Sequence, residues 1–320
     1  MKKTILLILL FVVPLAAQQF GQVGTSGAQL FKISFDPRAS ALGNAAASVV
    51  SNASALYTNV SGIEGIRNTD LAFTYVPWFA GIDMVSIAAA HRFGEIGVVG
   101  FQATGFSTNE EITTVEMENG TGQTYSIQNI VLGLSFARHI TEKLVIGAQV
   151  KYIRESYFDH STSGLAFDIG SNYDLGFLGS RLAMTLQNFG PDLNPLEGSY
   201  RDYSEGNVEK GFLRNPLPVT FRASFTMEPI VSEAYRARFI VDLIHPNDNI
   251  EHYCLGSEVL LYDFLAVRGG LKLNYDDESF AAGVGLMGGK FLGQNVRFDY
   301  SFEKFKVLPS VQKLSIGIAF

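Results

Sequence analysis

The feature that most constrains the fold is an alternation of apolar with small or polar side chains, which begins near residue 70 and continues to residue 320. It is clear where Leu144, Ile146, Ala148, Val150 and Tyr152 alternate with Val145, Gly147, Gln149 and Lys151. A period of two residues places one kind of side chain on each face of a β-strand. After residue 17, every apolar stretch is interrupted before it reaches the length of about 18 residues that marks a membrane-spanning helix. Any residence in a membrane would therefore come from strands.

The alternation predicts about fourteen strands, most of them near the length of about 9 to 11 residues that a tilted transmembrane strand needs. They lie near residues 70–78, 83–92, 95–105, 124–138, 144–156, 163–174, 180–189, 217–227, 235–244, 251–261, 264–275, 279–288, 294–304 and 311–320. Single-chain bacterial outer-membrane barrels have an even number of antiparallel strands. We therefore predict an all-β fold, an antiparallel transmembrane barrel that occupies residues 70–320.

The predicted connections alternate between tight and long, although several are of middling length. Phe93-Gly94, 139–143 and Tyr262-Asp263 are tight, whereas 106–123 and 190–216 are long. Outer-membrane barrels combine short periplasmic turns with longer outer loops. With an even strand count, both termini are then expected on the periplasmic side, where the segment 18–69 would also begin.

The face expected to point inward carries charges of both signs on successive strands. The predicted lumen charges are Lys151, Asp168, Arg222, Arg238, Asp242, Glu258, Arg268, Arg297 and Asp299. Such a mixture fits a wet or plugged lumen in which opposite charges pair. A secreted β-sandwich is the alternative, because it also buries one face of each strand. Strands of this number and length would then need two domains, and no linker is visible between residues 70 and 320.

The last predicted strand places Leu314, Ile316, Ile318 and Phe320 on one face, which we expect to contact lipid. Closure of a barrel pairs the last strand with the first. Phe320 is expected in the aromatic belt at the membrane interface. A terminal aromatic residue on an alternating strand also resembles the signal that outer-membrane assembly machinery recognises. These four residues are therefore the expected assembly signal, and that machinery is an expected partner.

Residues 1–17 have the features of a secretory signal peptide. Met1-Lys2-Lys3 is cationic, Thr4 to Ala16 is apolar, and Ala16-Ala17 offers small residues for cleavage before Gln18. The apolar run is shorter than the about 20 residues of a membrane-spanning helix. A buried N-terminal helix is the alternative. Combined with the strand pattern, the signal predicts residence in the outer membrane of a Gram-negative-type bacterium, in contact with outer-membrane lipid.

Residues 18–69 are rich in Ala, Ser, Gly and Asn and lack sustained alternation. Small residues allow short turns and helices to pack closely, so we predict that this segment is a hatch that plugs the barrel. Asn52 is placed to cap a short helical turn through Leu56-Tyr57. The alternative is a disordered leader, which the many apolar residues between Leu30 and Ile63 disfavour.

The stretches "GTSGAQLFKISFDPRASALGNAAASVV" (24–50) and "NASALYTNVSGI" (52–63) resemble the N-terminus of the PorV/PorQ family of outer-membrane proteins. That family is related in fold to the FadL fatty-acid transporters, which are barrels with an N-terminal hatch. Its pattern is Asp-Ala-Ser-Ala, an aromatic residue, and Asn-Pro-Ala-Gly. This chain keeps Ala53-Ser54-Ala55, Asn59 and Gly62 but has Asn52 for Asp, Val60 for Pro and Ser61 for Ala.

Further matches to the same family are "LQNFGPDL" (186–193), "LPVTFRASF" (217–225), "HPNDNIEHYCLGSE" (245–258) and "LAVRGGLKLNYDDESFAAGVGL" (265–286). The resemblance thus extends over nearly all of the chain that follows the predicted signal peptide. It implies a hatch whose key residues are Asn52, Ser54, Tyr57, Asn59 and Gly62.

No catalytic, cofactor or metal site is predicted, and we expect the protein not to be an enzyme. Residues 283–288 match the dinucleotide-binding pattern G-x-G-x-x-G, but a strand rather than a helix is expected after them. Gly283 and Gly285 are instead expected to make room inside the barrel. The five histidines, at 91, 139, 160, 245 and 252, lack a metal-ligand spacing, and Cys254 has no partner for a disulfide. A net charge of −7 argues against nucleic acid as a partner.

Two functions remain. The PorV/PorQ resemblance implies a barrel of the type IX secretion system that receives secreted cargo proteins or contacts other secretion-system subunits, with 106–123 and 190–216 as docking surfaces. The alternative is a FadL-like transporter of hydrophobic small molecules, with 18–69 as a movable hatch. An apolar entry pocket in the outer loops would favour transport, whereas 190–216 is polar and charged. The preferred expectation is therefore the secretion role.

Overall fold

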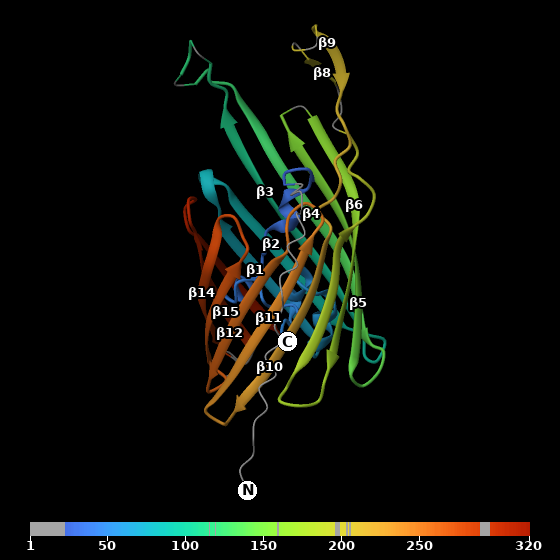
Figure 1. The fold of residues 1–320 in the computed structure, drawn as a ribbon, viewed down its shortest axis with the longest axis vertical. Helices are drawn as coiled ribbons and strands as arrows, with labels where there is room; N and C mark the ends of the chain where they lie inside the picture. Colours follow the sequence, from blue (N-terminus) through green and yellow to red (C-terminus); the bar gives the residue numbers. More distant parts are fainter. Residues whose placement is uncertain are drawn as a thin grey trace.

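Fourteen strands in the described part of the chain close into one antiparallel barrel, with each strand paired to its two neighbours (Figure 1). The structure is a computed structural model, and it describes residues 23–114, 116–118, 120–158, 160–195, 199–202, 204, 206–288 and 295–320. The predicted signal peptide, residues 1–17, lies outside these ranges.

The barrel strands lie close to the predicted ranges. They are β1 (Thr69–Pro77), β2 (Asp83–Arg92), β3 (Val98–Glu111), β4 (Thr124–His139), β5 (Leu144–Tyr157), β6 (His160–Asp174), β7 (Arg181–Phe189), β10 (Thr220–Val231), β11 (Tyr235–Pro246), β12 (His252–Leu261), β13 (Leu265–Leu273), β14 (Glu278–Met287), β15 (Asn295–Phe305) and β16 (Val311–Ala319). The barrel prediction is confirmed, and β16 pairs with β1 to close it.

Two features of the connections differ from the prediction. β3 continues to Glu111, so the first third of the predicted loop 106–123 is strand. The connection between β7 and β10 contains its own hairpin of β8 (Ser199–Asp202) and β9 (Val208–Gly211). Both segments are polar and rise beyond the barrel (Figure 1), where a strand needs no apolar face. We call the described residues within 107–125 and 199–211 the outer arms.

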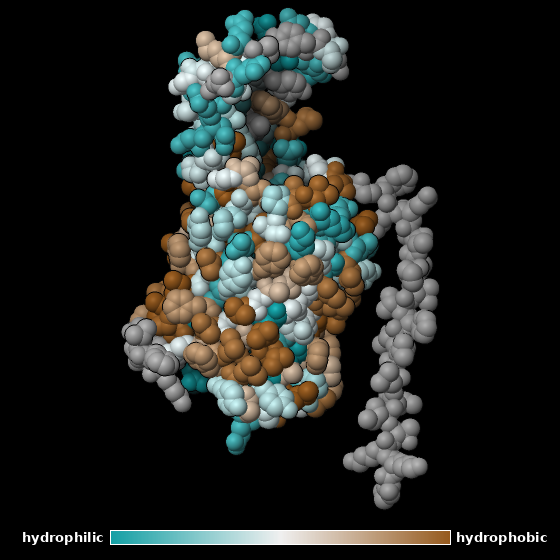
Figure 2. Space-filling view, turned by 90° about the vertical axis from the view of Figure 1, so that its left-hand side faces the viewer, coloured by the Kyte–Doolittle hydropathy of each residue, from teal (hydrophilic) through white to brown (hydrophobic). Residues whose placement is uncertain are grey.

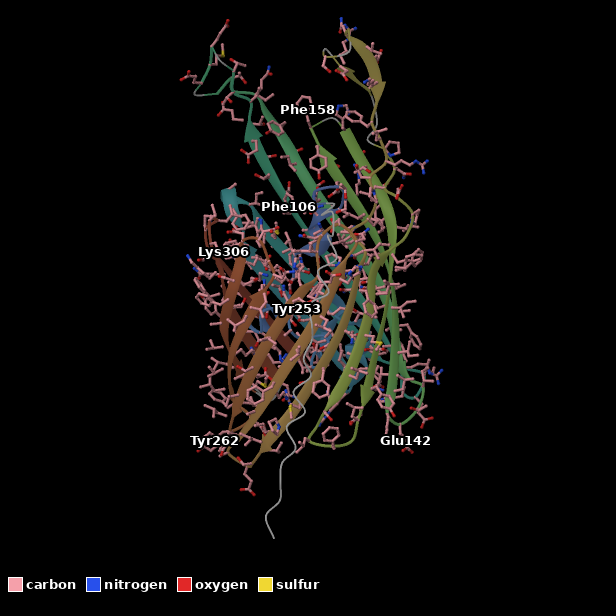
Figure 3. All side chains as sticks on the ribbon, in the orientation of Figure 1. Phe106, Glu142, Phe158, Tyr253, Tyr262 and Lys306 are labelled. Carbon is pink, nitrogen blue, oxygen red and sulfur yellow. The ribbon has the colours of Figure 1, made fainter. Side chains whose placement is uncertain are left out.

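The barrel has a short-turn end and a long-loop end. Glu142 in the β4–β5 turn and Tyr262 in the β12–β13 turn mark the lower end in Figure 3, whereas Phe158 and Lys306 mark the opposite end. The chain leaves β16 at the lower end, where the Phe320 amide donates to the Thr69 carbonyl at 2.9 Å. In outer-membrane barrels the short turns are periplasmic, so we call the lower end periplasmic and the other end outer.

The outward face of the barrel wall is apolar. Exposed side chains on β1 to β3 include Leu71, Phe73, Val85, Ile87 and Phe101. Figure 2 shows brown, hydrophobic side chains over much of the wall, below the teal atoms of the outer arms. Exposed aromatic side chains gather near the periplasmic turns, as in the interfacial belt of membrane barrels: Phe93, Phe177, Tyr235, Tyr262, Phe264 and Phe320.

Residues 23–69 lie inside the barrel and form short helical turns. These are η1 (Gln29–Lys32), α1 (Pro37–Ala41), η2 (Ala53–Tyr57) and η3 (Val60–Gly65). Asp36, Asn52 and Asn59 cap α1, η2 and η3 by accepting from the backbone N–H two residues later, which confirms the predicted cap at Asn52. None of the helices in these described ranges is long and apolar enough to cross a membrane.

The hatch packs against wall positions that lack a side chain. A Cβ at Gly283 would lie 2.5 Å from Ala41 Cβ of α1, and a Cβ at Gly147 would lie 2.7 Å from the Ser61 amide of η3. A Cβ at Gly285 would lie 2.5 Å from Asp299 Oδ1. The prediction that Gly283 and Gly285 make room inside the barrel is therefore confirmed.

Candidate functional site

A ladder of ion pairs crosses the inner face of β11, β12, β13 and β15. Glu258 accepts from Arg238 at 3.0 Å and from Arg268 at 2.7 Å, and Arg268 also donates to Asp299 at 2.6 Å. Arg238, Glu258 and Arg268 stand directly opposite one another in the strand register. Opposite charges at facing positions stabilise neighbouring strands. These wall charges therefore neutralise one another.

The other predicted lumen charges also point inward and are paired. Lys151 contacts Asp168 at 2.7 Å, Arg222 contacts Asp242 at 3.2 Å, and Arg297 contacts Asp70 at 2.7 Å. The structure therefore places all nine predicted residues on the inner face, in pairs that the sequence did not identify.

The hatch is tied to this charged wall at several points. Arg38 of α1 donates to both carboxylate oxygens of Glu258, at 2.9 and 2.8 Å. The Ala46 and Ala47 amides donate to Asp242, and the Ala53 amide donates to Asp70 at 3.0 Å. Lys313 donates to the Ser34 carbonyl at 2.9 Å and to the Ser40 hydroxyl at 2.8 Å. These contacts hold the hatch inside the lumen.

Several charged residues of the lumen and the hatch escaped the sequence analysis. Asp70, Lys272, Glu303 and Lys313 lie on the inner face, where Lys272 and Lys313 both contact Glu303. Each occupies an inward position of its strand, so continuing the alternation to the strand ends would have found them. Arg38 carries no such signal, because it belongs to a segment without alternation.

The five predicted hatch residues have structural contacts. Asn52 caps η2, and Ser54 is buried within it. Asn59 caps η3 and donates to the Ala47 carbonyl at 2.8 Å and to the Ser171 carbonyl of β6. A Cβ at Gly62 would overlap the backbone of Val50, and the Tyr57 hydroxyl bonds to Ser86 of β2. All five lie within the described hatch.

Replacing Glu258 with Gln should destabilise the barrel. Arg38, Arg238 and Arg268 would lose the negative charge that compensates them in the lumen. Breaking a buried ion pair from one side costs about 3 to 5 kcal/mol. We expect the folded, heat-modifiable gel band to disappear at a lower urea concentration than in the unchanged protein.

Glu142→Gln is the matched control, because Glu142 is exposed in a periplasmic turn. Its unfolding midpoint should not move. Equal midpoints for Glu258→Gln and Glu142→Gln would contradict the structural role of the ladder.

An outer cavity of about 340 Å³ lies between the hatch and the outer rim of the barrel. Hatch residues form one side of it, and strand ends and outer turns from β7 to β15 form the other. Its apolar lining comes from Phe31, Ile33, Tyr57, Ile244, Tyr275 and Phe305. Its polar lining includes Lys32, Asn44, Arg222 and Asp248. This combination suits a ligand with a large apolar part and a small polar group.

A group of aromatic side chains stands beside the cavity at the outer rim. Trp78 and Phe79 in the β1–β2 turn pack against Phe305, with ring centroids 6.4 and 5.4 Å apart. Ile82 and Phe106 belong to the same partly buried cluster. We call Trp78, Phe79, Phe106 and Phe305 the aromatic collar. Phe305 lines the cavity itself, and the β1–β2 turn supplies Trp78 and Phe79 of the collar from the run "PWFAGI" (77–82).

The start of the described hatch also lies at the outer end, so the expectation that this segment begins on the periplasmic side is wrong for residues 26–32. The Gly27 amide donates to the Pro216 carbonyl, and Ser26 and Lys32 both contact Asp248 in the β11–β12 turn. From there the hatch descends, and its η3 turn reaches the periplasmic end. Glu64 of η3 contacts Arg92 and His139 there, both at 2.8 Å.

A second cavity of about 200 Å³ lies at the periplasmic end, between η3 and the turns after β4 and β6. Between the two cavities stands the buried apolar core of the hatch, which includes Leu42, Ala46, Leu56 and Ile63. The lumen is therefore divided into an outer and a periplasmic compartment.

The expected assembly residues lie on β16 and just after it. Leu314, Ile316 and Phe320 are exposed on the outer wall, and Ile318 is half-buried on the same face. Within the described ranges, no group of three or more His, Cys, Asp or Glu residues is arranged to hold a metal ion.

No protein-family model matches this chain, and no curated protein matches its sequence. Solved structures do match its fold. The monoaromatic hydrocarbon channel CymD has a TM-score of 0.57 at 13% identity, covering 90% of this chain and 98% of CymD. The toluene transporter TbuX of Ralstonia pickettii has 0.54 at 13%, covering 89% and 97%. A FadL homologue of Pseudomonas aeruginosa has 0.57 at 10%, covering 90% and 98%.

At identities this low, the similarity shows the fold alone. The chain folds as a closed, fourteen-stranded antiparallel barrel like those of FadL-type outer-membrane proteins.

Proposed function

We propose that this protein is a channel through which hydrophobic small molecules cross the outer membrane. The observation that carries the proposal is the outer cavity, which is bordered by the aromatic collar and closed below by the hatch. Apolar molecules would leave water at the collar, occupy the cavity and pass inward when the hatch moves. Two of the matched barrels are a monoaromatic hydrocarbon channel and a toluene transporter, which supports this proposal.

Binding of a fluorescent apolar probe, N-phenyl-1-naphthylamine, to the protein in lipid nanodiscs tests this proposal. We expect saturable binding that Phe31→Glu and Ile33→Glu each weaken by about tenfold or more. A fully buried large apolar side chain contributes about 1.5 to 3 kcal/mol, and 1.4 kcal/mol corresponds to a factor of ten.

Phe158→Glu is the matched control, since Phe158 is exposed in the β5–β6 turn and does not line the cavity. Its affinity for the probe should be unchanged. Equal affinities in all variants, or no saturable binding above empty nanodiscs, would contradict a ligand site in the outer cavity.

The secretion role implied by the PorV/PorQ resemblance is the second candidate. The observation that favours it is the pair of outer arms, which rise beyond the barrel and are hydrophilic (Figure 2). Replacing residues 112–123 by a short Gly-Ser linker should then abolish capture of exported cargo. If cargo handling is normal and probe binding persists, the secretion candidate fails and the channel candidate stands.

A further inference from the structure

The outer and the periplasmic cavity approach each other along one side of the hatch, and the following inference rests on the proposed channel function. On the hatch, Thr58 lines the outer cavity, whereas Ser61 lines the periplasmic cavity. On the wall, Arg222 of β10 lines the outer cavity and Asn172 of β6 lines the periplasmic one. The barrier between the two cavities is therefore thin on this side of the lumen.

The register of β10, β7 and β6 shows how short the barrier is along the wall. Two consecutive inward rows cross these strands, an upper row of Arg222, Thr185 and Gly170 and a lower row of Ser224, Ala183 and Asn172. Residues two apart in a strand face the same side, so the rows are about 7 Å apart. The outer cavity reaches the upper row and the periplasmic cavity reaches the lower one.

Asn59 of the hatch lies against the upper row. A Cβ at Gly170 would lie 2.1 Å from Asn59 Oδ1 and 3.4 Å from Val60 Cγ1, so the Asn59 side chain occupies the space that Gly170 leaves free. Asn59 Nδ2 donates to the Ser171 carbonyl of β6 at 3.2 Å. Among the described residues, this neutral hydrogen bond is the one that joins the Asn59 side chain to the wall. We call the contact of Thr58–Ser61 with Gly170 and Ser171 the seam.

The hatch would be harder to separate from the wall elsewhere. Toward β2, Leu56 shares one buried apolar cluster with Ala88, and separation would expose that cluster to water. Toward β12, Arg38 is paired with Glu258, and separation would leave buried charges unpaired. A neutral hydrogen bond such as that of Asn59 can be exchanged for one to water at small net cost.

Thr185, the neighbour of Gly170 on β7, gives a second reason for the seam to open. Its Oγ1 is buried and has no partner among the described residues. A buried hydroxyl without a partner is unfavourable. Water that enters an opened seam would bond to this hydroxyl, so opening relieves a local cost of the closed state.

We propose that molecules pass from the outer to the periplasmic cavity along the seam, and that Asn59 is the residue that closes it. Thr58–Ser61 would move away from β6, while Lys313 of β16, on the opposite side of the barrel, keeps its hydrogen bonds to Ser34 and Ser40. The hatch would therefore stay in the lumen during passage.

Conductance of the full-length protein in planar bilayers tests the role of Asn59. Asn59→Ala should raise the conductance in potassium chloride severalfold above that of the unchanged protein, because the space beside Gly170 is then empty. Asn59→Ala combined with Gly170→Ala should return it toward the baseline, since the new methyl group refills that space. Asn52→Ala is the matched control and should stay at the baseline. Asn52 caps η2 as Asn59 caps η3, but on the side of the hatch where the Ala53 amide donates to Asp70 of β1.

Thiol modification locates the path in a protein that keeps Asn59. Cys254→Ser removes the native thiol, and a cysteine is then placed at Thr185 or at Ala72, which are similarly buried on the inner faces of β7 and β1. A water-soluble methanethiosulfonate should modify Thr185→Cys several times faster than Ala72→Cys, because local opening exposes the seam before the apolar side of the hatch.

If Asn59→Ala does not fold, the thiol experiment decides alone. Baseline conductance of folded Asn59→Ala, an equal leak in Asn52→Ala, or a leak that Gly170→Ala does not reduce would overturn the role of Asn59. Equal modification rates at Thr185→Cys and Ala72→Cys would overturn the path along the seam. In each of these cases, saturable binding of the apolar probe would leave the channel proposal in place, whereas loss of that binding as well would refute both.

Discussion

A protein that lacks residues 24–66 should conduct ions as an open pore, whereas the full-length protein should stay near the baseline conductance in a planar bilayer. Barrels of eight strands already fill their interior with side chains, and wider barrels enclose space that water occupies unless it is plugged. Here the plug is the hatch, whose core residues Leu42, Leu56 and Ile63 are fully or almost fully buried in the lumen. Its removal should expose a polar, continuous lumen.

The wall is expected to survive this deletion, because most of its inner charges pair with other wall residues. Glu258 keeps Arg238 and Arg268, Asp242 keeps Arg222, and Glu303 keeps Lys272 and Lys313. Heat-modifiable migration in gels verifies that the barrel has folded before conductance is recorded.

A milder variant separates hatch motion from hatch loss. Arg38→Ala removes the bidentate contact to Glu258 but leaves the hatch in the chain, so brief openings are expected instead of a steady pore. Porin-like conductance by the unchanged protein would show that the hatch does not close it. If the variant that lacks residues 24–66 folds but does not conduct, the outer turns rather than the hatch close the pore.

Deletion of residues 313–320 should abolish folded barrel in outer membranes. β16 forms six residue pairs with β1 and nine with β15. Without it, two strand edges would face lipid with unpaired N–H and C=O groups, each of which costs several kcal/mol in a solvent without water. We expect the protein to be degraded, which immunoblots of membrane fractions would detect.

Phe320→Asp separates strand pairing from recognition by the assembly machinery. The Phe320 amide can still donate to the Thr69 carbonyl, so the purified variant should refold in detergent. In cells its folded level should fall well below that of Phe93→Asp, a control at an exposed aromatic residue of the same end. Equal folded levels of Phe320→Asp and Phe93→Asp would contradict an assembly role for Phe320. Wild-type levels of folded barrel after deletion of residues 313–320 would show that β16 is not needed.

The strands were predictable to within a few residues at most ends because the signal is local. Residues 144–156 were predicted as a strand and Leu144–Tyr157 is one, since alternation over a dozen residues needs no knowledge of the partners. β8 and β9 were missed, because a polar hairpin beyond the barrel has no buried face and hence no apolar period.

The candidate site was less predictable. The inward charges on the strands could be predicted from the alternation, yet Arg38 lies in a segment without a period and contacts Glu258 across 220 residues of sequence. The long outer loops were expected to be docking surfaces, and the aromatic collar was not predicted, because its Trp78 and Phe79 occupy one of the short outer connections. Turn length alone does not reveal which turns fold over the lumen.

The sequence by itself determined that this chain forms a strand-built barrel with an apolar outer face, a charged inner face and a separate small-residue segment before it. These properties follow from the side-chain period and the composition, which can be read from each strand without knowing its partners. Only the tertiary structure decided which charges pair, how the hatch divides the lumen, and that Phe31, Asp248 and Phe305 border one cavity. Those contacts join residues far apart in the chain, and they exist only once closure of the barrel has brought its strands around the hatch.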